Sequence, residues 1–332
     1  MLSVLGALAV VVLAVLAWAV VWYEGEVNPG APGPATVVTI PSGTGVSGVA
    51  ALLAHQQVVG SSLALRIYFA LHGTPQIAAG GYLLHRHASF AAVRGALERG
   101  PDVFAVDVLP GLTFAEVASR VGEVPGRSAA SFSALAASGA VRSPYAPAGV
   151  TDLDGLLGTG VYQVLPGETE TTLLQQMVDR FDATAQAVGL TAGAAALGVT
   201  PYQVVTVASI VQKEGVYSQN LDKVARVVYN RLAKHMALQM DSTVLFSEHR
   251  DGGPVTAADL ALDTPYNTYL HKGLTPTPIC FPSQASLEAA LHPATGSWLY
   301  FVVVQRDGTE AFADTFAEQL ANEQLAKSRG LG

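Results

Sequence analysis

The chain is poor in charged residues and in cysteine, and each shortage excludes a class of protein. Only 13% of its 332 residues are charged, about half of the usual share, and the formal net charge at pH 7 is −8. Because binding to phosphate backbones needs a basic face, we expect no nucleic acid among the partners. The single cysteine, Cys280, excludes an internal disulfide framework and a cysteine-rich metal site.

Charge is also missing from the N-terminus, where Leu2–Trp22 is a run of 21 uncharged residues. As a helix, this run spans roughly 32 Å, which matches a hydrocarbon core of about 30 Å. Trp22 and Tyr23 suit the interfacial aromatic belt. A cleaved signal peptide is the alternative, since Ala17–Ala19 resembles a cleavage site, but signal peptides have apolar regions of only about 7–15 residues. We therefore predict an uncleaved transmembrane anchor over residues 1–23, whose orientation is not set by charge because no Lys or Arg precedes it.

A recurring strand-turn-helix pattern follows a linker that we place at residues 24–35, where Asn28–Pro34 is rich in proline and glycine. Each copy joins a short β-branched or aromatic run to an amphipathic helix, in most copies through a Pro-containing turn. The copies cover residues 36–55, 82–97, 104–121 and 161–181. Such units bury a helix face on a small sheet, and the repeat alone favours a packing unit without a ligand.

Beyond residue 200 the sequence predicts a mixed α+β domain. Thr200–Gln203 is a capping box with proline at the first helical position, and the helix is expected to end at Gly215 in a left-handed C-cap. Further helices are expected at residues 220–234 and 283–291, then a hairpin at 298–313 and a last helix from Thr315.

Glu214 is the candidate catalytic residue. On a helix it falls on the same side as Val207 and Ile210, whereas Gln212 and Lys213 fall on the opposite, solvated side. Burial on an apolar face and the negative end of the helix dipole both raise the pKa of a carboxyl, as a general acid requires. The alternative is a boundary glutamate with its head in solvent, or one that pairs with Arg226 or Arg231.

Two polar clusters could complete a cleft for sugars. One is the loop Thr264–Tyr269, from which we predict four substrate-binding residues, and the other lies after the second helix. Flat aromatic faces combined with amide and hydroxyl groups suit sugar rings, their hydroxyls and their acetamido groups. Taken alone, either cluster is explained by residues that favour turns. Together with a carboxyl of perturbed pKa, the two clusters predict a cleft. The predicted binding residues are Tyr266, Asn267, Thr268, Tyr269, Gln239, Asp241 and Ser242.

Ala208–Glu214 (ASIVQKE) resembles the ASIVEKE signature of the YceG-like endolytic murein transglycosylases, the MltG family. The resemblance continues in order through seven further motifs. These are Val228–Leu232, Leu238–Val244, Thr264–Tyr269, Gly273–Pro276, Pro278–Cys280, Ala289–Ala294 and Leu299–Val302. The pattern Val38–Gly43 resembles, more weakly, the membrane-proximal LysM-like region of the family.

The resemblance implies an α+β fold with three parts: the N-terminal transmembrane helix, a small LysM-like α/β domain at residues 36–110, and a mixed α+β catalytic domain at 111–332. It also implies that Glu214 is the catalytic residue and adds Asn230 to the binding residues. The implied enzyme is a lytic transglycosylase that needs no metal or cofactor and acts outside the cell membrane. Its implied partners are peptidoglycan glycan strands, the cytoplasmic membrane and cell-wall synthases. It cleaves between N-acetylmuramic acid and N-acetylglucosamine and leaves a 1,6-anhydro end.

The sequence departs from the family pattern at several positions. Gln212 replaces the first glutamate of the signature, Gly215-Val216 replaces a threonine, Phe281 stands for an asparagine and Glu310 for a histidine. The segment Asp154–Gly158 is a degraded copy of a further family motif. These changes bear on substrate preference more than on reaction type.

Three alternatives from other classes stay open. A peptidoglycan-binding anchor without activity would leave the polar clusters without a purpose. A serine hydrolase would use Ser209 and Lys213, which share a helix face. A metalloenzyme would have to use scattered histidines, of which only His85 and His87 lie close together, and bound zinc would revive that option.

Overall fold

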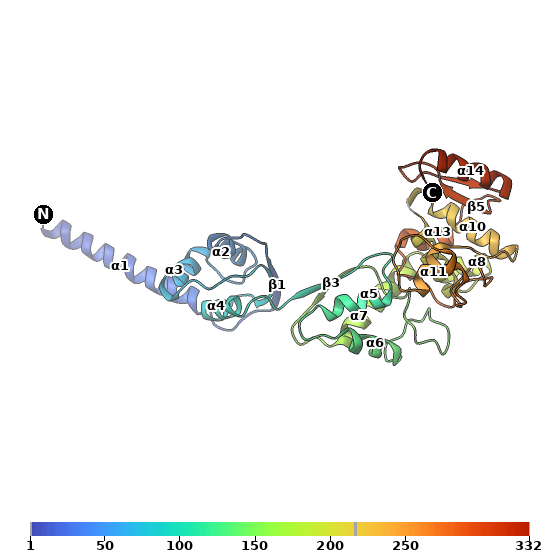
Figure 1. Ribbon diagram of the computed structural model, residues 1–332. Helices are drawn as coiled ribbons and strands as arrows, with labels where there is room; N and C mark the ends of the chain where they lie inside the picture. Colours follow the sequence, from blue (N-terminus) through green and yellow to red (C-terminus); the bar gives the residue numbers. More distant parts are fainter. Residues whose placement is uncertain (1, 216–217, 332) are drawn as a thin grey trace. The chain divides into compact units, whose positions relative to one another are not determined.

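The computed structural model describes residues 2–215 and 218–331, and its contacts divide the chain into two compact units (Figure 1). Unit 1 is Met1–Ala105 with Gln163–Glu168, and unit 2 is Val106–Tyr162 with Thr169–Gly332. Helices and strands occur in both units, so the α+β class is confirmed. The division lies near the predicted boundary at residue 110, while the LysM-like and catalytic assignments remain predictions. Val216, one of the departures from the family pattern, lies outside the described residues.

Unit 1 begins with the long apolar helix α1 (Leu2–Val27), whose segment Gly6–Val27 is long and apolar enough to cross a membrane. The helix continues four residues past the predicted end at Tyr23, so the first part of the predicted linker is wrong. The cause is tertiary: Trp22, Tyr23 and Val27 pack against the hydrophobic core of unit 1. The connection to the first strand therefore starts at Asn28.

The folded part of unit 1 is a two-stranded antiparallel sheet covered by three helices. Strands β1 (Ala35–Ile40) and β2 (Gly80–His85) pair with Val38 opposite Tyr82. In both strands alternate residues are buried, as a half-buried sheet requires. The helices are α2 (Val46–His55), α3 (Ser62–His72) and α4 (Phe90–Arg99), of which α3 was not predicted.

Strands β3 (Phe104–Val108) and β4 (Gly160–Val164) form a second two-stranded sheet, and the division between the units runs through both. Their partners in the predicted repeat, α5 (Phe114–Gly122) and α7 (Glu170–Ala187), belong to unit 2. All four predicted copies therefore form, but they do not make up one N-terminal domain. Helix α6 (Ala129–Ala137) packs against α5 and α7.

The core of unit 2 surrounds α9 (Pro201–Glu214), which contacts α8 (Leu190–Leu197), α10 (Leu221–Ala233), α11 (Asp241–Ser247) and α13 (Gln284–Leu291). The predicted capping box at Thr200 is present. The remaining elements are the 3-10 turn η1 (Ser218–Asn220), α12 (Ala257–Ala261), the hairpin β5 (Tyr300–Val303) with β6 (Glu310–Ala313), and α14 (Phe316–Ser328).

Two expectations for α9 are wrong. The helix is buried on all sides from Val204 to Val211 rather than on one face, because neighbouring helices enclose it. Gly215 has φ −77°, so it is not a left-handed cap. The glycine is required by close packing instead: a Cβ there would overlap the Leu221 side chain and the Val211 carbonyl oxygen.

Candidate functional site

Glu214 ends α9 and points its carboxylate at the first turn of α11. Its Oε1 accepts hydrogen bonds from the Ser242 hydroxyl at 2.6 Å and from the Ser242 backbone N–H at 3.2 Å. Within the described part of the chain, every hydrogen bond to this carboxyl reaches Oε1. Part of the residue remains accessible to solvent.

Burial raises the pKa of the Glu214 carboxyl above its ordinary value. The two hydrogen bonds from Ser242 oppose that rise because they favour the ionised form, and the charge of Asp241 adds to it. Arg231 lowers the pKa, but only as the smallest of these influences. The raised pKa favours the protonated form of the carboxyl, and the hydrogen bonds from Ser242 stabilise its charge once the proton leaves.

Asp241 and Tyr269 lie next to Ser242 on the accessible side of the site. The Tyr269 hydroxyl donates to Asp241 Oδ1 at 2.5 Å, and both residues are at least partly accessible to solvent. Burial is the largest cause of a raised pKa at Tyr269, and the Asp241 carboxylate adds to it. A phenol and a carboxylate beside an acid offer hydrogen bonds to sugar hydroxyls.

Other predicted binding residues use their polar groups inside the protein. Asn267 is fully buried, and its amide donates to the carbonyl oxygens of Leu260 and Leu262. The Thr268 hydroxyl accepts from the Met240 N–H at 3.0 Å. These contacts fix the loop against the start of α11.

Tyr266, Asn230 and Gln239 have comparable internal partners. The Tyr266 hydroxyl contacts the Thr277 hydroxyl at 3.0 Å, and the Asn230 amide donates to the carbonyl oxygens of Gly296 and Trp298. Gln239 has φ 51° and donates its N–H to the Thr268 carbonyl. This left-handed residue turns the chain into the segment that carries Asp241 and Ser242.

Arg226 and Arg231, the partners considered for Glu214, donate hydrogen bonds to backbone carbonyl oxygens instead. Arg231 is 7% exposed and donates to the carbonyl oxygens of Leu238 and Leu299, each at 2.6 Å. Arg226 donates to the carbonyl oxygens of Pro293 and Ala294. No ion pair to Glu214 occurs among the described residues, so its charge is stabilised by hydrogen bonds.

Gln212 is not on a solvated face, which corrects a prediction. Its Oε1 accepts from the Ser283 N–H and the Ser286 hydroxyl, both at 2.9 Å, and so secures the start of α13. Gln212 therefore has a local structural role, which a glutamate carboxylate at this position could also fill.

The serine hydrolase alternative is contradicted by the contacts of Ser209 and Lys213. Ser209 is fully buried, donates to the Thr206 carbonyl and accepts from the Ile279 N–H. Lys213 forms an ion pair with Asp251 at 2.6 Å. A buried hydroxyl without access to substrate or to a free base cannot act as a nucleophile.

A second buried carboxyl, Glu310 on β6, is affected by the charge of Glu214. Burial raises its pKa to about 7, the Asn220 side chain opposes the rise, and the charge of Glu214 adds to it. The sequence identified Glu310 only as a departure from the family pattern. The effect of Glu214 on Glu310 was not predictable, because nearly 100 residues separate the two positions.

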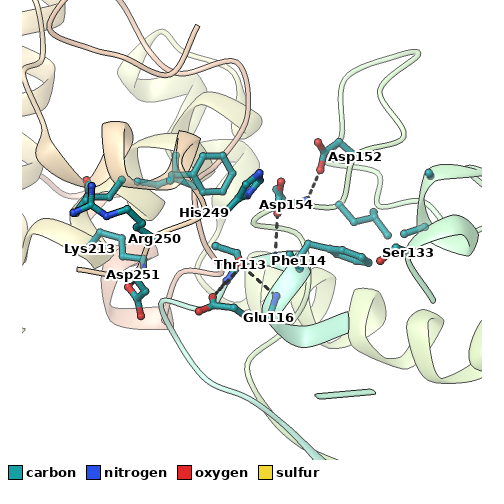
Figure 2. A pocket seen from close by; sticks show the side chains of 18 of the residues that line it. Thr113, Phe114, Glu116, Ser133, Asp152, Asp154, Lys213, His249, Arg250 and Asp251 are labelled. Atoms are coloured by element: carbon teal, nitrogen blue, oxygen red, sulfur yellow. Dashed lines mark hydrogen bonds and ion pairs between the residues drawn. The ribbon is translucent and has the colours of Figure 1, made fainter. Parts of the chain in front are cut away.

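A cavity of about 570 Å³ opens beside Ser242, entirely within unit 2. Figure 2 shows the carboxyl groups of Asp152 and Asp154 on one side and Lys213, Arg250 and Asp251 on the other. Its wall also includes the apolar side chains of Phe114, Leu245, Phe246 and Ile279 and the polar residues Thr113, Glu116, Ser133, Thr151 and His249. The volume is that of an ordinary small-molecule site.

The pKa of Asp154 is unusually high for an aspartate. Burial raises its pKa to about 7, and the neighbouring Asp152 charge contributes to the rise. One oxygen accepts the Phe114 N–H at the start of α5, at 3.2 Å. The sequence had drawn attention to residues 154–158 only as a degraded motif, since nothing in it places that segment beside α11.

Comparisons with known proteins agree on one family. The model described as the YceG-like family matches residues 38–325. A Bacillus subtilis (strain 168) protein named endolytic murein transglycosylase is 28% identical over 309 residues, which cover 88% of this chain and 85% of the relative. A Streptococcus pneumoniae (strain D39) protein of the same name is 26% identical over 83% of this chain.

The chain spans about half of that pneumococcal relative, 56% of its length. A crystal structure of a YceG-like protein from Listeria monocytogenes is similar with a TM-score of 0.57 and 25% sequence identity. The likeness covers 87% of this chain and 99% of that one.

Proposed function

Because the chain belongs to the YceG-like family, we propose that it is an endolytic murein transglycosylase that cleaves peptidoglycan glycan strands. The observation that carries the proposal is the state of Glu214: a buried carboxyl with a raised pKa, held by Ser242 through one oxygen only. Two curated relatives bear this activity in their names.

In the proposed mechanism Glu214 acts alone as acid and then as base. Its proton passes to the glycosidic oxygen between N-acetylmuramic acid and N-acetylglucosamine, and the bond from the muramyl C1 to that oxygen breaks. The Glu214 carboxylate then takes the proton of the muramyl 6-hydroxyl, whose oxygen bonds to C1. The products are a 1,6-anhydro end and a free N-acetylglucosamine hydroxyl, and the proton count of the enzyme is restored.

Ser242 makes both halves of this cycle possible. Its hydroxyl and N–H donate to the carboxylate and stabilise it after the first proton transfer, while burial keeps the acid form available before it. One carboxyl therefore suffices where ordinary glycosidases use two.

We assign the substrate contacts to the residues that remain accessible. We expect Asp241, Ser242, Tyr269 and Gln239 to face the strand, because each is at least partly exposed and the Tyr269–Asp241 hydrogen bond lies beside Ser242. The other predicted binding residues, Tyr266, Asn267, Thr268 and Asn230, act as positioning residues through the internal contacts described above. The cavity beside Ser242 would receive a substituent of the strand close to the cleaved bond.

We further propose that α1 anchors the chain in the cytoplasmic membrane with residues 28–332 on the outer side, where the substrate lies. Its length and apolar composition support the anchor. A LysM-like role for residues 36–110 and contacts with cell-wall synthases belong to the same proposal. Protease accessibility in spheroplasts tests the topology, and protection of unit 2 would contradict it.

Product analysis tests the reaction. Full-length protein in detergent is incubated with polymeric, uncrosslinked peptidoglycan, and the products are separated and weighed by mass spectrometry. The proposal expects internal cleavage with 1,6-anhydro ends, each lighter by one water than a reducing end. Reducing ends would show attack by water and overturn the transglycosylase reaction, while intact strands would overturn the cleavage itself.

A further inference from the structure

Helix α3 exposes a row of large apolar side chains. Leu63, Ile67 and Leu71 are 56%, 39% and 68% exposed, and their spacing of four residues places them on one face. The opposite face supplies Ala64, Leu65, Tyr68 and Phe69 to the core of unit 1. Single exposed leucines are ordinary on protein surfaces, whereas a continuous row marks an interaction site.

The position of α3 identifies what covers this row. α3 contacts α1 directly, and Figure 1 shows it beside the C-terminal part of that helix. Trp22, Tyr23 and Val27, at the end of the apolar helix, pack against the same core as α3. The folded part of unit 1 therefore packs directly against the C-terminal end of α1.

The length of α1, compared with the thickness of a bilayer, places α3 at the membrane surface. The 21 uncharged residues Leu2–Trp22, all within α1, extend roughly 32 Å as a helix, which matches a hydrocarbon core of about 30 Å. The border of the hydrocarbon then falls near Trp22 and Tyr23, where aromatic residues prefer to lie. A helix that touches this part of α1 lies at the level of the lipid headgroups.

We propose that the face of α3 formed by Leu63, Ile67 and Leu71 inserts into the outer leaflet of the bilayer that α1 crosses. The inference rests on the proposed membrane anchor and goes beyond it, because it gives unit 1 a second attachment to lipid. Interfacial helices bury their apolar face about 5–10 Å into the headgroup region. Arg66, exposed on the same side of α3, can extend its guanidinium to lipid phosphates while its stem covers apolar surface.

The two attachments together would hold unit 1 against the membrane instead of letting it pivot on α1. A second copy of the chain is a less fitting occupant, because the row lies beside the membrane-spanning helix and carries a cation suited to anionic lipid. At the level of the headgroups, a bilayer supplies acyl chains for the apolar row of α3 and phosphates for Arg66.

Site-specific fluorescence in the full-length protein tests the proposal. Cys280 is fully buried, and burial raises its pKa to about 12, so it should resist labelling. The variants Ile67→Cys and Leu71→Cys are labelled with an environment-sensitive dye and reconstituted into vesicles of phosphatidylcholine and phosphatidylglycerol. Ala51→Cys on the exposed side of α2 is the matched control.

Lipids brominated near the top of the acyl chains should quench both α3 labels several-fold more strongly than the Ala51→Cys label, and aqueous iodide should quench them less. Adding Leu63→Ser to the Ile67→Cys protein should weaken the lipid quenching. Equal quenching at all three sites, or crosslinking between copies through Leu71→Cys, would overturn the proposal. Protein that fails to float with vesicles would overturn the anchor as well, whereas muropeptide release from the same samples reports separately on the enzymatic function.

Discussion

Replacing Ser242 by alanine should shift the pH dependence of strand cleavage to higher pH. The change removes the hydroxyl that donates to Glu214 Oε1 at 2.6 Å and leaves the backbone N–H at 3.2 Å in place. A hydrogen bond to a charged group contributes about 1.5–3 kcal/mol, and each pKa unit corresponds to about 1.4 kcal/mol. Since Glu214 is partly accessible and water can replace the hydroxyl, we take the lower end of the range and expect a rise of about one pKa unit.

The sign follows from which form of Glu214 the hydroxyl stabilises. Ser242 favours the carboxylate, so its loss raises the pKa further and the acid form persists to higher pH. The descending limb of the profile, where the general acid loses its proton, should therefore move by about one unit to the alkaline side. The maximal rate should fall, because the charged intermediate state of Glu214 is less stable.

The assay is the initial rate of muropeptide release between pH 5 and pH 9. Ser247→Ala is the matched control, because its hydroxyl lies on the same helix and donates to the Val244 carbonyl at 2.8 Å. The control should keep the wild-type profile. An unchanged profile for Ser242→Ala, or a shift to lower pH, would refute the assignment of Ser242 as the residue that tunes the acid.

Three further predictions follow from the contacts around the site. Asn267→Ala removes a fully buried amide together with its hydrogen bonds to the carbonyl oxygens of Leu260 and Leu262 and should lower the free energy of unfolding by about 2–4 kcal/mol. Denaturant titration measures this change, and unchanged stability with weaker substrate binding would instead make Asn267 a sugar ligand. Gly215→Ala should cost about 1–3 kcal/mol through overlap with Leu221, and a more stable variant would contradict the packing argument. Glu310→Gln removes a carboxyl that is charged only above its pKa of about 7. Because repulsion between two carboxylates is reciprocal, the alkaline part of the pH profile should move to lower pH, and a profile that stays in place would show that the two carboxyls do not interact.

The parts of the fold that local sequence rules govern were predictable. Thr200 and Thr315 form the capping boxes that start α9 and α14, because the signal lies within four consecutive residues. Likewise, all four strand-turn-helix copies form where their hydrophobic periods and turn residues indicated. Burial raises the pKa of Glu214 as the sequence predicted, although the helix that carries it is enclosed and not amphipathic; its catalytic role stays a prediction.

Features that depend on distant segments were not predictable. Asn267 looks like a sugar ligand in sequence, and only the position of α12 shows that its amide serves two backbone carbonyls. Gln212 reads as an exposed residue until α13 is placed against it. The cavity joins residues near 114, 154 and 246, and Leu63, Ile67 and Leu71 form a visible row only once their neighbours are known to fill the core.

The most direct test of the account is the Glu214→Gln variant, which keeps the shape and hydrogen-bonding capacity of the side chain but cannot donate and retake a proton. Glu288→Gln, the same substitution at an exposed position of α13, is the control, and the two proteins are compared at equal folded concentration. We expect release of 1,6-anhydro muropeptides from polymeric strands to fall by at least about 10²-fold in Glu214→Gln and to stay at the wild-type rate in Glu288→Gln. Release by Glu214→Gln at a rate comparable to wild type would contradict the single-glutamate mechanism.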